Sequence, residues 1–179
     1  MEKIAVSFLK LSAKWEKPPQ VIDFVSILTS AKSVLIIMPD NLEEFGTANN
    51  FISDIKSEFV NAKFFFLSRK NYQTLLDLDK TDGTIFVTAD DINYFGLPKK
   101  KLRQKIMAAA CDVIIDLNLG FHLLSTLLCY LSKAPMRICF DETNREPFYN
   151  FSYRANSERN VEEKYQGLIK YMGIGASIY

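Results

Sequence analysis

Apolar residues along the chain fall into short runs and longer periodic stretches. The short runs hold three to six residues, as expected of strands that are buried on both faces. They occupy residues 33–38, 63–67, 84–87, 113–115 and 136–140. The longer stretches repeat apolar residues every three or four positions, which is the period of a helix. Strands that alternate with helices predict an α/β fold with a doubly wound, mostly parallel sheet of about five to six strands.

The predicted helices lie between these strands and towards both ends of the chain. They cover residues 20–31, 47–59, 71–77, 98–110, 121–131 and 158–172, with a single helical turn at 90–95. Pro18-Pro19 breaks the chain before the first helix, Thr47 is the expected N-cap of the second, and Gly173 ends the last. Residues 33–179 are therefore predicted to form one Rossmann-like domain.

Residues 1–32 are predicted to be a helical N-terminal extension of that domain. The first 17 residues mix four lysines with apolar residues at helical spacing, namely Ile4, Phe8, Leu9, Leu11 and Trp15. This pattern is typical of an amphipathic helix of about three turns. One interpretation is an extra helix packed on the domain. The other is a peripheral membrane contact, because lysine and tryptophan suit a lipid interface.

Residues 112–140 are the most informative stretch because they have the size of one βαβ unit. An apolar run is followed by the polar turn Asp116–Gly120, an apolar helix, the break at Ala134-Pro135 and a second apolar run. Open α/β sheets bind ligands at the carboxyl ends of their strands. One wall of any site is therefore expected at Asp116–His122.

Composition and charge narrow the class of protein. The chain has 179 residues, 48% of them hydrophobic, which suits one ordinary domain with a substantial core. Lysine plus arginine number 22 against 21 aspartate plus glutamate, so nucleic acid is not an expected partner. No apolar run has the length of a membrane span, and the lysine-rich N-terminus is a poor signal peptide. These features predict a cytoplasmic protein, with peripheral contact at the inner face of the membrane as the alternative.

Neither a cofactor nor a metal is expected. The dinucleotide-binding motif G-x-G-x-x-G and the phosphate loop G-x-x-x-x-G-K-[ST] are both absent. Cys111, Cys129 and Cys139 lack metal-ligand spacing and lie in or beside apolar runs, which predicts buried, reduced thiols. His122 is the only histidine, so a dedicated zinc site is not expected.

The loop after the first strand holds the candidate catalytic residues. It contains Asp40, Asn41 and Glu44. A carboxylate at the carboxyl end of a central strand could act as a general base toward a hydroxyl group, given the right geometry. Asn41 is a candidate for binding the substrate beside it. The alternative interpretation is a solvated acidic loop without chemistry.

The turn after the fourth strand is the second candidate site. It contains Asp116, Asn118 and His122, and any imidazole chemistry must use His122. The functional interpretation is that these side chains contact a substrate. The alternative is a neutral histidine packed near the start of a helix.

Two groups of basic residues are candidates for binding anions. Five positive charges fall within Lys99–Lys105, which suits phosphate groups or an anionic lipid surface, or else only the wet face of a helix. Arg137 and Arg145 lie in and after the fifth strand, where an arginine could hold an anionic substrate. An ion pair with Asp141 or Glu142 is the alternative for these arginines.

Four stretches, taken in order, have a recognisable pattern. They read SVLIIMPDNLEEFG from Ser33, SEFVNAKFFFLSRKNYQTLL from Ser57, DVIIDLNLGFHLLSTLLCYLSKAPMRICFD from Asp112 and NVEEKYQGLIKYMGI from Asn160. Together they resemble the N-terminal, acceptor-side domain of family 9 glycosyltransferases, the bacterial ADP-heptose:lipopolysaccharide heptosyltransferases. The resemblance implies a Rossmann-like half of a GT-B fold.

The resemblance also ranks the candidate bases. The first-strand loop of the family carries Gly-Asp, whose aspartate is the proposed base, and the matching positions here read Glu43-Glu44. A second family glycine, in R-I-G-F, is replaced by Cys139. Glu44 is therefore the first candidate for a base and Asp40 the second. The substrate-binding candidates are Asn41, Asp116, Asn118, His122, Arg137 and Arg145.

Three functions are compatible with this resemblance. In the family a C-terminal domain binds the nucleotide sugar, and this chain, which ends at Tyr179, is expected to lack it. The expected function is a stand-alone acceptor-side domain without independent catalysis, which binds a glycan, glycolipid or phosphorylated small molecule. The first alternative is half of a split inverting glycosyltransferase, completed by a separate donor-binding chain. The second is a structural or assembly protein, with a homo-oligomer among its expected partners.

Overall fold

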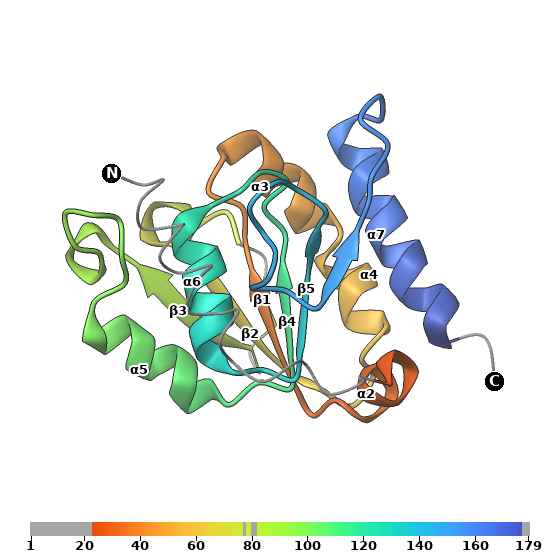
Figure 1. The fold of residues 1–179 in the computed structure, drawn as a ribbon, viewed down its shortest axis with the longest axis horizontal. Helices are drawn as coiled ribbons and strands as arrows, with labels where there is room; N and C mark the ends of the chain where they lie inside the picture. The colour runs from red at the N-terminus through yellow and green to blue at the C-terminus, as the bar shows by residue number, and fades with distance from the viewer. Residues whose placement is uncertain (1–22, 77, 80–81, 177–179) are drawn as a thin grey trace.

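The computed structural model describes residues 23–76, 78–79 and 82–176 as a sheet between two layers of helices (Figure 1). Six strands of this part of the chain form one parallel sheet in the order β3-β2-β1-β4-β5-β6. They are β1 (Ser33–Ile37), β2 (Lys63–Arg69), β3 (Gly83–Val87), β4 (Val113–Asp116), β5 (Met136–Phe140) and β6 (Phe151–Tyr153). The predicted doubly wound parallel sheet is confirmed. The amphipathic helix predicted at 1–17 lies outside the described residues.

The helices follow the strands as the periodic pattern predicts, with some changes in their bounds. The α-helices are α2 (Phe24–Ser30), α3 (Leu42–Asn50), α4 (Ile52–Ser57), α5 (Lys100–Ala109), α6 (Leu123–Ser132) and α7 (Val161–Ala176). Short 3₁₀ turns occupy η1 (Lys70–Tyr72) and η2 (Ala89–Asp91). The helix predicted at 71–77 is wrong, because only the turn η1 forms at its start.

The helix predicted at 47–59 with Thr47 as its cap is also wrong. The helix begins earlier because the Asn41 side chain accepts hydrogen bonds from the backbone N–H groups of Glu43 and Glu44. At Phe51 the backbone leaves helical geometry, with φ −102° and ψ 2°, and separates α3 from α4. Residues predicted to be an acidic loop are therefore the first turn of a helix.

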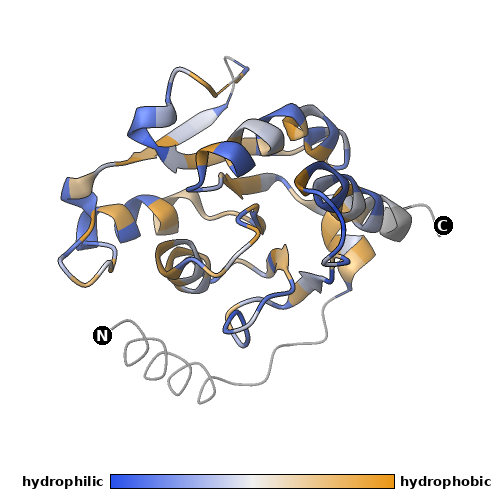
Figure 2. Cartoon of the chain, turned by 90° about the horizontal axis from the view of Figure 1, so that it is seen from above, coloured by the Kyte–Doolittle hydropathy of each residue, from blue (hydrophilic) through white to orange (hydrophobic). Residues whose placement is uncertain are grey.

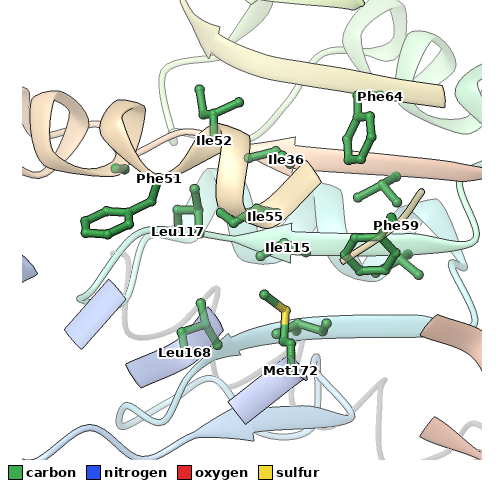
Figure 3. Packing of buried hydrophobic residues seen from close by; sticks show 14 of the residues in the cluster. Ile36, Phe51, Ile52, Ile55, Phe59, Phe64, Ile115, Leu117, Leu168 and Met172 are labelled. Atoms are coloured by element: carbon green, nitrogen blue, oxygen red, sulfur yellow. The ribbon is translucent and has the colours of Figure 1, made fainter. Parts of the chain in front are cut away.

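Different helices cover the two faces of the sheet. On one face α2, α3, α4 and α7 pack against β1 residues Val34 and Ile36. Figure 3 shows the α4 side chains beside Ile36, and the α7 side chains Leu168 and Met172 beyond Ile115. On the other face α5 and α6 pack against Leu35 and Ile37. Successive strand residues point to opposite faces, so a central strand between two helical layers must be apolar throughout. In Figure 2 the central strands are mostly orange, and the helices around them carry both colours.

The three cysteines are buried free thiols, as predicted. Burial raises the pKa of Cys111 and the pKa of Cys139 to about 12. Both groups therefore stay protonated near neutral pH, where a thiol is a poor nucleophile and a poor metal ligand. The cysteines belong to the core rather than to a reactive site.

The end of α5 yields a prediction about stability. Ala110 lies in the left-handed region, with φ 44° and ψ 48°, where a Cβ is strained and glycine is not. Ala110→Gly is expected to stabilise the fold by about 0.5–1 kcal/mol, after allowance for the greater freedom of glycine in the unfolded chain. Urea unfolding measures the change. The matched control is Ala108→Gly, at an exposed position inside the same helix, which should cost about 1 kcal/mol. A loss of stability in both variants would contradict the prediction.

Candidate functional site

Asp40, Arg69 and His122 meet at the carboxyl edge of the sheet. Asp40 follows β1, Arg69 ends β2, and His122 lies between β4 and α6. The Arg69 guanidinium donates from Nε to Oδ1 of Asp40 and from Nη2 to Oδ2, the second bond being 2.9 Å long. Nε2 of His122 lies 3.4 Å from the same Oδ2. Three neighbouring strands thus bring together one group of polar side chains, Asp40, Arg69 and His122, which we call the edge cluster.

The backbone around the edge cluster is also held in place. The N–H of Asp40 donates to Oδ1 of Asn118 at 3.0 Å, and its carbonyl accepts from the Tyr72 hydroxyl at 3.0 Å. Asn118 belongs to the turn after β4, so its side chain ties together the loops that follow the two central strands. His122 is the N-cap residue of α6 and has an extended backbone. The geometry of the cluster is therefore set by three separate parts of the chain.

The charges of the edge cluster favour an ionised Asp40. The His122 imidazole and the Arg69 guanidinium hold the pKa of Asp40 well below its ordinary range, against partial burial, which acts in the opposite direction. Asp40 in turn raises the pKa of Arg69. A carboxylate held in this way has little tendency to take up a proton. Asp40 is therefore better suited to accepting hydrogen bonds than to acting as a general base.

Two adjoining hollows open beside this cluster. The inner hollow has a volume of about 20 Å³, room for about one water molecule, and its walls include Asp40, Asn118 and Ser125. The outer hollow has a volume of about 390 Å³, within the usual range of small-molecule sites. The outer walls are Arg69, Ile92, Tyr94, Phe95, Gly96, His122, Leu123 and Leu124. Arg69, His122 and Leu124 line both hollows, so we treat the two as one site, the edge groove.

Asp116 lies beneath this groove and has no exposed surface. Its Oδ1 accepts from the backbone N–H and the side-chain amide of Asn118, at 3.1 and 2.7 Å. Its Oδ2 accepts from the hydroxyls of Ser125 and Tyr149, at 2.8 and 2.5 Å. These four hydrogen bonds match the roughly four lone-pair sites of a carboxylate. Asp116 therefore positions the turn that leads to His122.

Arg145 is also buried, with 2% of its surface exposed. Its guanidinium donates to the backbone carbonyls of Asn118, at 2.6 Å, of Gly120, and of Phe140, at 3.3 Å. Arg145 thus holds the same turn from the other side. The ion pair considered for it with Asp141 does not form, since the carboxylate of Asp141 accepts from Arg154 instead.

Arg137 lies apart from the edge cluster, near the amino end of β5. Its guanidinium donates to the carbonyls of Phe148 and Ala134, at 2.8 and 2.9 Å. A parallel strand presents its two ends at opposite edges of the sheet, so Arg137 does not line the edge groove. The contacts of Arg137 hold the chain around β5.

Asn41 and Glu44 have structural contacts as well. Asn41 caps α3, and Oε2 of Glu44 accepts from the backbone N–H of Leu119 at 3.2 Å. Of the eight candidates named from the sequence, Asp40, Asn118 and His122 line the groove. The others lie around or beneath it, or, for Arg137, near the amino edge.

Sequence reasoning missed Arg69 and the loop that carries Tyr94 and Phe95. The second strand was expected to end with its apolar run at residue 67, but its pairing with β3 continues to Arg69, opposite Val87. The polar pair Ser68-Arg69 directly after that run was the available signal, because it marks a carboxyl edge. Tyr94 and Phe95 were missed because their position beside the groove depends on how the chain runs between β3 and α5, which the sequence does not reveal.

Within the described part of the chain, no helix is long and apolar enough to cross a bilayer. The same described residues contain no group of three or more histidine, cysteine, aspartate or glutamate side chains placed to hold a metal ion.

A parallel six-stranded sheet, helical layers on both faces and a polar groove at the carboxyl edge define a Rossmann-like α/β domain. The chain belongs to DUF6913, a family of unknown function, whose model matches residues 7–174. No curated protein sequence matches the chain.

The fold is similar to that of solved heptosyltransferases. Escherichia coli heptosyltransferase WaaC with ADP has a TM-score of 0.60 and 16% identity, over 78% of this chain and 46% of that one. A family 9 glycosyltransferase from Veillonella parvula has a TM-score of 0.61 and 12% identity, over 84% of this chain and 43% of that one. E. coli ADP-heptose lipopolysaccharide heptosyltransferase II has a TM-score of 0.61 and 14% identity, over 76% of this chain and 40% of that one. The chain spans less than half the length of each, and at these identities the likeness shows a shared glycosyltransferase-like fold.

The depressed pKa of Asp40 makes stability depend on pH. Its value in the folded chain lies below the value of about 3.9 expected in an unfolded chain, so the ionised carboxylate stabilises the fold above about pH 4. That contribution is lost as the pH falls through the folded pKa. Asp40→Asn should therefore cost more stability near pH 7 than near pH 3, as measured by urea unfolding. Arg69→Gln should weaken the dependence of stability on pH. A stability cost of Asp40→Asn that is the same at pH 7 and pH 3 would contradict the prediction.

The buried carboxylate of Asp116 gives a second prediction. Asp116→Ala should cost about 3–5 kcal/mol, because hydrogen-bond donors of Asn118, Ser125 and Tyr149 lose their acceptor inside the core. Tyr149→Phe removes one of these bonds and should cost about 1–2 kcal/mol. Chemical unfolding of both variants measures the difference. Equal costs would show that the other donors do not depend on the carboxylate.

Proposed function

We propose that this chain is a glycosyltransferase-like domain that binds a carbohydrate in the edge groove and does not catalyse transfer on its own. The observation that carries the proposal is the edge cluster, in which one ionised carboxylate lies against two nitrogen donors at the wall of the groove. A sugar offers hydroxyl groups that donate and accept hydrogen bonds together. Asp40 can accept such bonds, and Arg69 and His122 can donate them.

The charge of the cluster favours a hydroxyl over a phosphate. A phosphate group has only acceptor oxygens at its charged end, and Asp40 would repel it. The carboxylate of Asp40 also compensates the charge of Arg69, which would otherwise attract an anion. The inner hollow has room for about one water molecule, which matches a single hydroxyl group and is small for a phosphate.

The outer part of the groove suits the rest of a sugar ring. Ile92, Phe95, Leu123 and Leu124 give it apolar walls. The faces of a pyranose ring carry C–H groups that pack on apolar and aromatic side chains, while its edges carry hydroxyls. A groove with a polar end and apolar walls follows the usual construction of a small-molecule site.

Binding without catalysis is supported by the state of the two candidate bases. The carboxylate of Asp40 is held by Arg69 and has a lowered pKa. Glu44 accepts a hydrogen bond from the backbone of Leu119. A general base must take a proton from the acceptor hydroxyl, and both carboxylates have structural partners instead.

One contact favours a second candidate function, half of a split glycosyltransferase. Oδ2 of Asp40 lies 3.4 Å from Nε2 of His122, and a carboxylate in that place can orient an imidazole whose other nitrogen accepts a proton. This function requires a separate chain that binds the nucleotide sugar. Sugar transfer on mixing the chain with such a partner, and its loss in His122→Gln, would favour this function over binding alone.

Ligand binding can be tested by a thermal-shift screen followed by calorimetry. The panel contains hexoses, heptoses, short oligosaccharides and, as a comparison, inorganic phosphate. A bound sugar should raise the melting temperature by mass action. Arg69→Ala and His122→Ala should each weaken sugar binding about tenfold or more, because each removes a polar contact to the ligand.

The matched control is Arg154→Ala. Arg154 also pairs with an aspartate, Asp141, but does not line the groove, so its loss should leave sugar affinity unchanged. A screen that responds to inorganic phosphate and to no sugar would overturn the proposal. Equal effects of the Arg154 and Arg69 variants would place the ligand elsewhere.

A further inference from the structure

The loop between η2 and α5 presents two aromatic rings to solvent. Tyr94 is 89% exposed and Phe95 is 57% exposed. Their ring centroids lie 5.6 Å apart in an edge-to-face arrangement. Large apolar side chains in such positions contribute little to the core, and a group of them marks an interaction surface.

This loop is a built structure with its own hydrogen bonds. The Asn93 side chain accepts from the N–H groups of Phe95 and Leu97, at 2.9 and 3.0 Å. The Asn93 backbone bonds to Leu97 and Gly96, and Gly96 has the positive φ of 77° that favours glycine. A β-bridge between Ile92 and Pro98 closes the base. These contacts fix the conformation of the loop, so the exposure of the two rings does not require a bound partner.

The basic residues of the chain concentrate directly after this loop. The segment 89–110 contains five of the basic residues and two acidic ones, Asp90 and Asp91, so its charge is +3, whereas the whole chain has +1. The five basic residues, Lys99, Lys100, Lys101, Arg103 and Lys105, are all exposed. The run predicted from the sequence is thus a solvated face of α5, with more positive charge than the rest of the molecule.

The helical period divides this face. Leu102 and Ile106 point into the core. Lys100, Arg103 and the 57% exposed Met107 are spaced three and four residues apart and share one exposed stripe, which we call the outer side of α5. Lys101 and Lys105 lie nearer to Asp91, and their positive charges help the hydrogen bonds from Thr88 to lower the pKa of that carboxyl group. In Figure 1 this helix and the loop before it lie at the end of the molecule opposite α7.

We propose that the Tyr94–Phe95 loop and the outer side of α5 dock the chain onto an anionic lipid bilayer. Aromatic rings favour the interface between lipid headgroups and acyl chains, and adjacent lysine and arginine side chains bind the anionic headgroups. Both elements are present in one short segment. The charge complementarity selects an anionic bilayer over a neutral one.

This surface is distinct from the predicted amphipathic helix at residues 1–17 and does not depend on the proposed sugar-binding function. It does adjoin the groove, because Tyr94 and Phe95 also line the outer hollow beside His122. Docking through these rings would bring the mouth of the edge groove to the headgroup layer. If the groove binds sugar as proposed above, a membrane glycolipid headgroup becomes the expected ligand.

Sedimentation of the full chain with lipid vesicles tests the docking surface. Vesicles of phosphatidylcholine alone are compared with vesicles that also contain phosphatidylglycerol. We expect binding to the mixed vesicles only, and weaker binding as salt rises, because salt screens exposed charges. Lys100→Gln/Arg103→Gln should weaken binding about tenfold or more, at about fivefold per charge. Tyr94→Ser/Phe95→Ser should weaken it by a similar factor.

Each variant has a matched control. Arg159→Gln/Lys170→Gln removes two exposed charges from the other end of the chain, and Val60→Ser removes an exposed apolar side chain. Both controls should bind as the parent does. Lys10→Gln/Lys14→Gln, within residues 1–17, separates the contribution of the N-terminal segment. All the changed residues of the loop and α5 are exposed, so thermal melting should be little altered.

Three results would overturn the proposal. The first is no binding to the phosphatidylglycerol vesicles. The second is binding lost in the Lys10/Lys14 variant but unchanged in the loop and α5 variants, which would assign the contact to the N-terminus. The third is a change in oligomeric state, seen by analytical sedimentation, in the loop and α5 variants without any change in vesicle binding. That result would make this surface a protein interface.

Discussion

The buried carboxylate of Asp116 is the interaction on which the carboxyl edge of the sheet depends. A charged group at the end of a central strand is costly to bury unless hydrogen bonds replace its water. The replacements come from the turn after β4, from α6 and from the loop after β5, through Asn118, Ser125 and Tyr149. One carboxylate thus joins three segments, and Arg145 completes the arrangement by holding the carbonyls of the same turn. The position of His122 follows from these contacts.

The polar residues of this edge separate into two layers with different roles. Asp116 and Arg145 are buried and fix the backbone. Asp40, Arg69 and His122 are partly exposed and border the groove. Because the charges of Asp40 and Arg69 compensate each other, the groove offers directed hydrogen bonds with little net attraction for anions. The segment 89–110, by contrast, carries a net charge of +3, so the uncompensated positive charge lies outside the edge cluster.

Much of the fold was predictable because strands buried on both faces require apolar runs, and β1 has such a run from Val34 to Ile37. The strand β6 was not predicted, since it has three residues with an exposed Ser152 between two half-buried rings. The start of α3 depended on one cap, Asn41, that the pattern of apolar residues does not reveal. At the site, the sequence indicated the correct turn. It could not tell that Asp116 faces the core, or that Arg69 reaches Asp40, because both facts depend on strands that are distant in sequence.

The strand order has a consequence for how the chain folds. β1 pairs on one side with β2, which follows soon after it in the sequence. On the other side it pairs with β4, where Val34 lies opposite the distant Val113. During synthesis β1, β2 and β3 can associate while one long edge of β1 stays open until residues 113–116 emerge. Contacts between distant segments slow folding, and an open apolar edge can pair with other chains. The half-made sheet is therefore the stage at which this domain has most need of a chaperone, and fragments that end before β4 should aggregate.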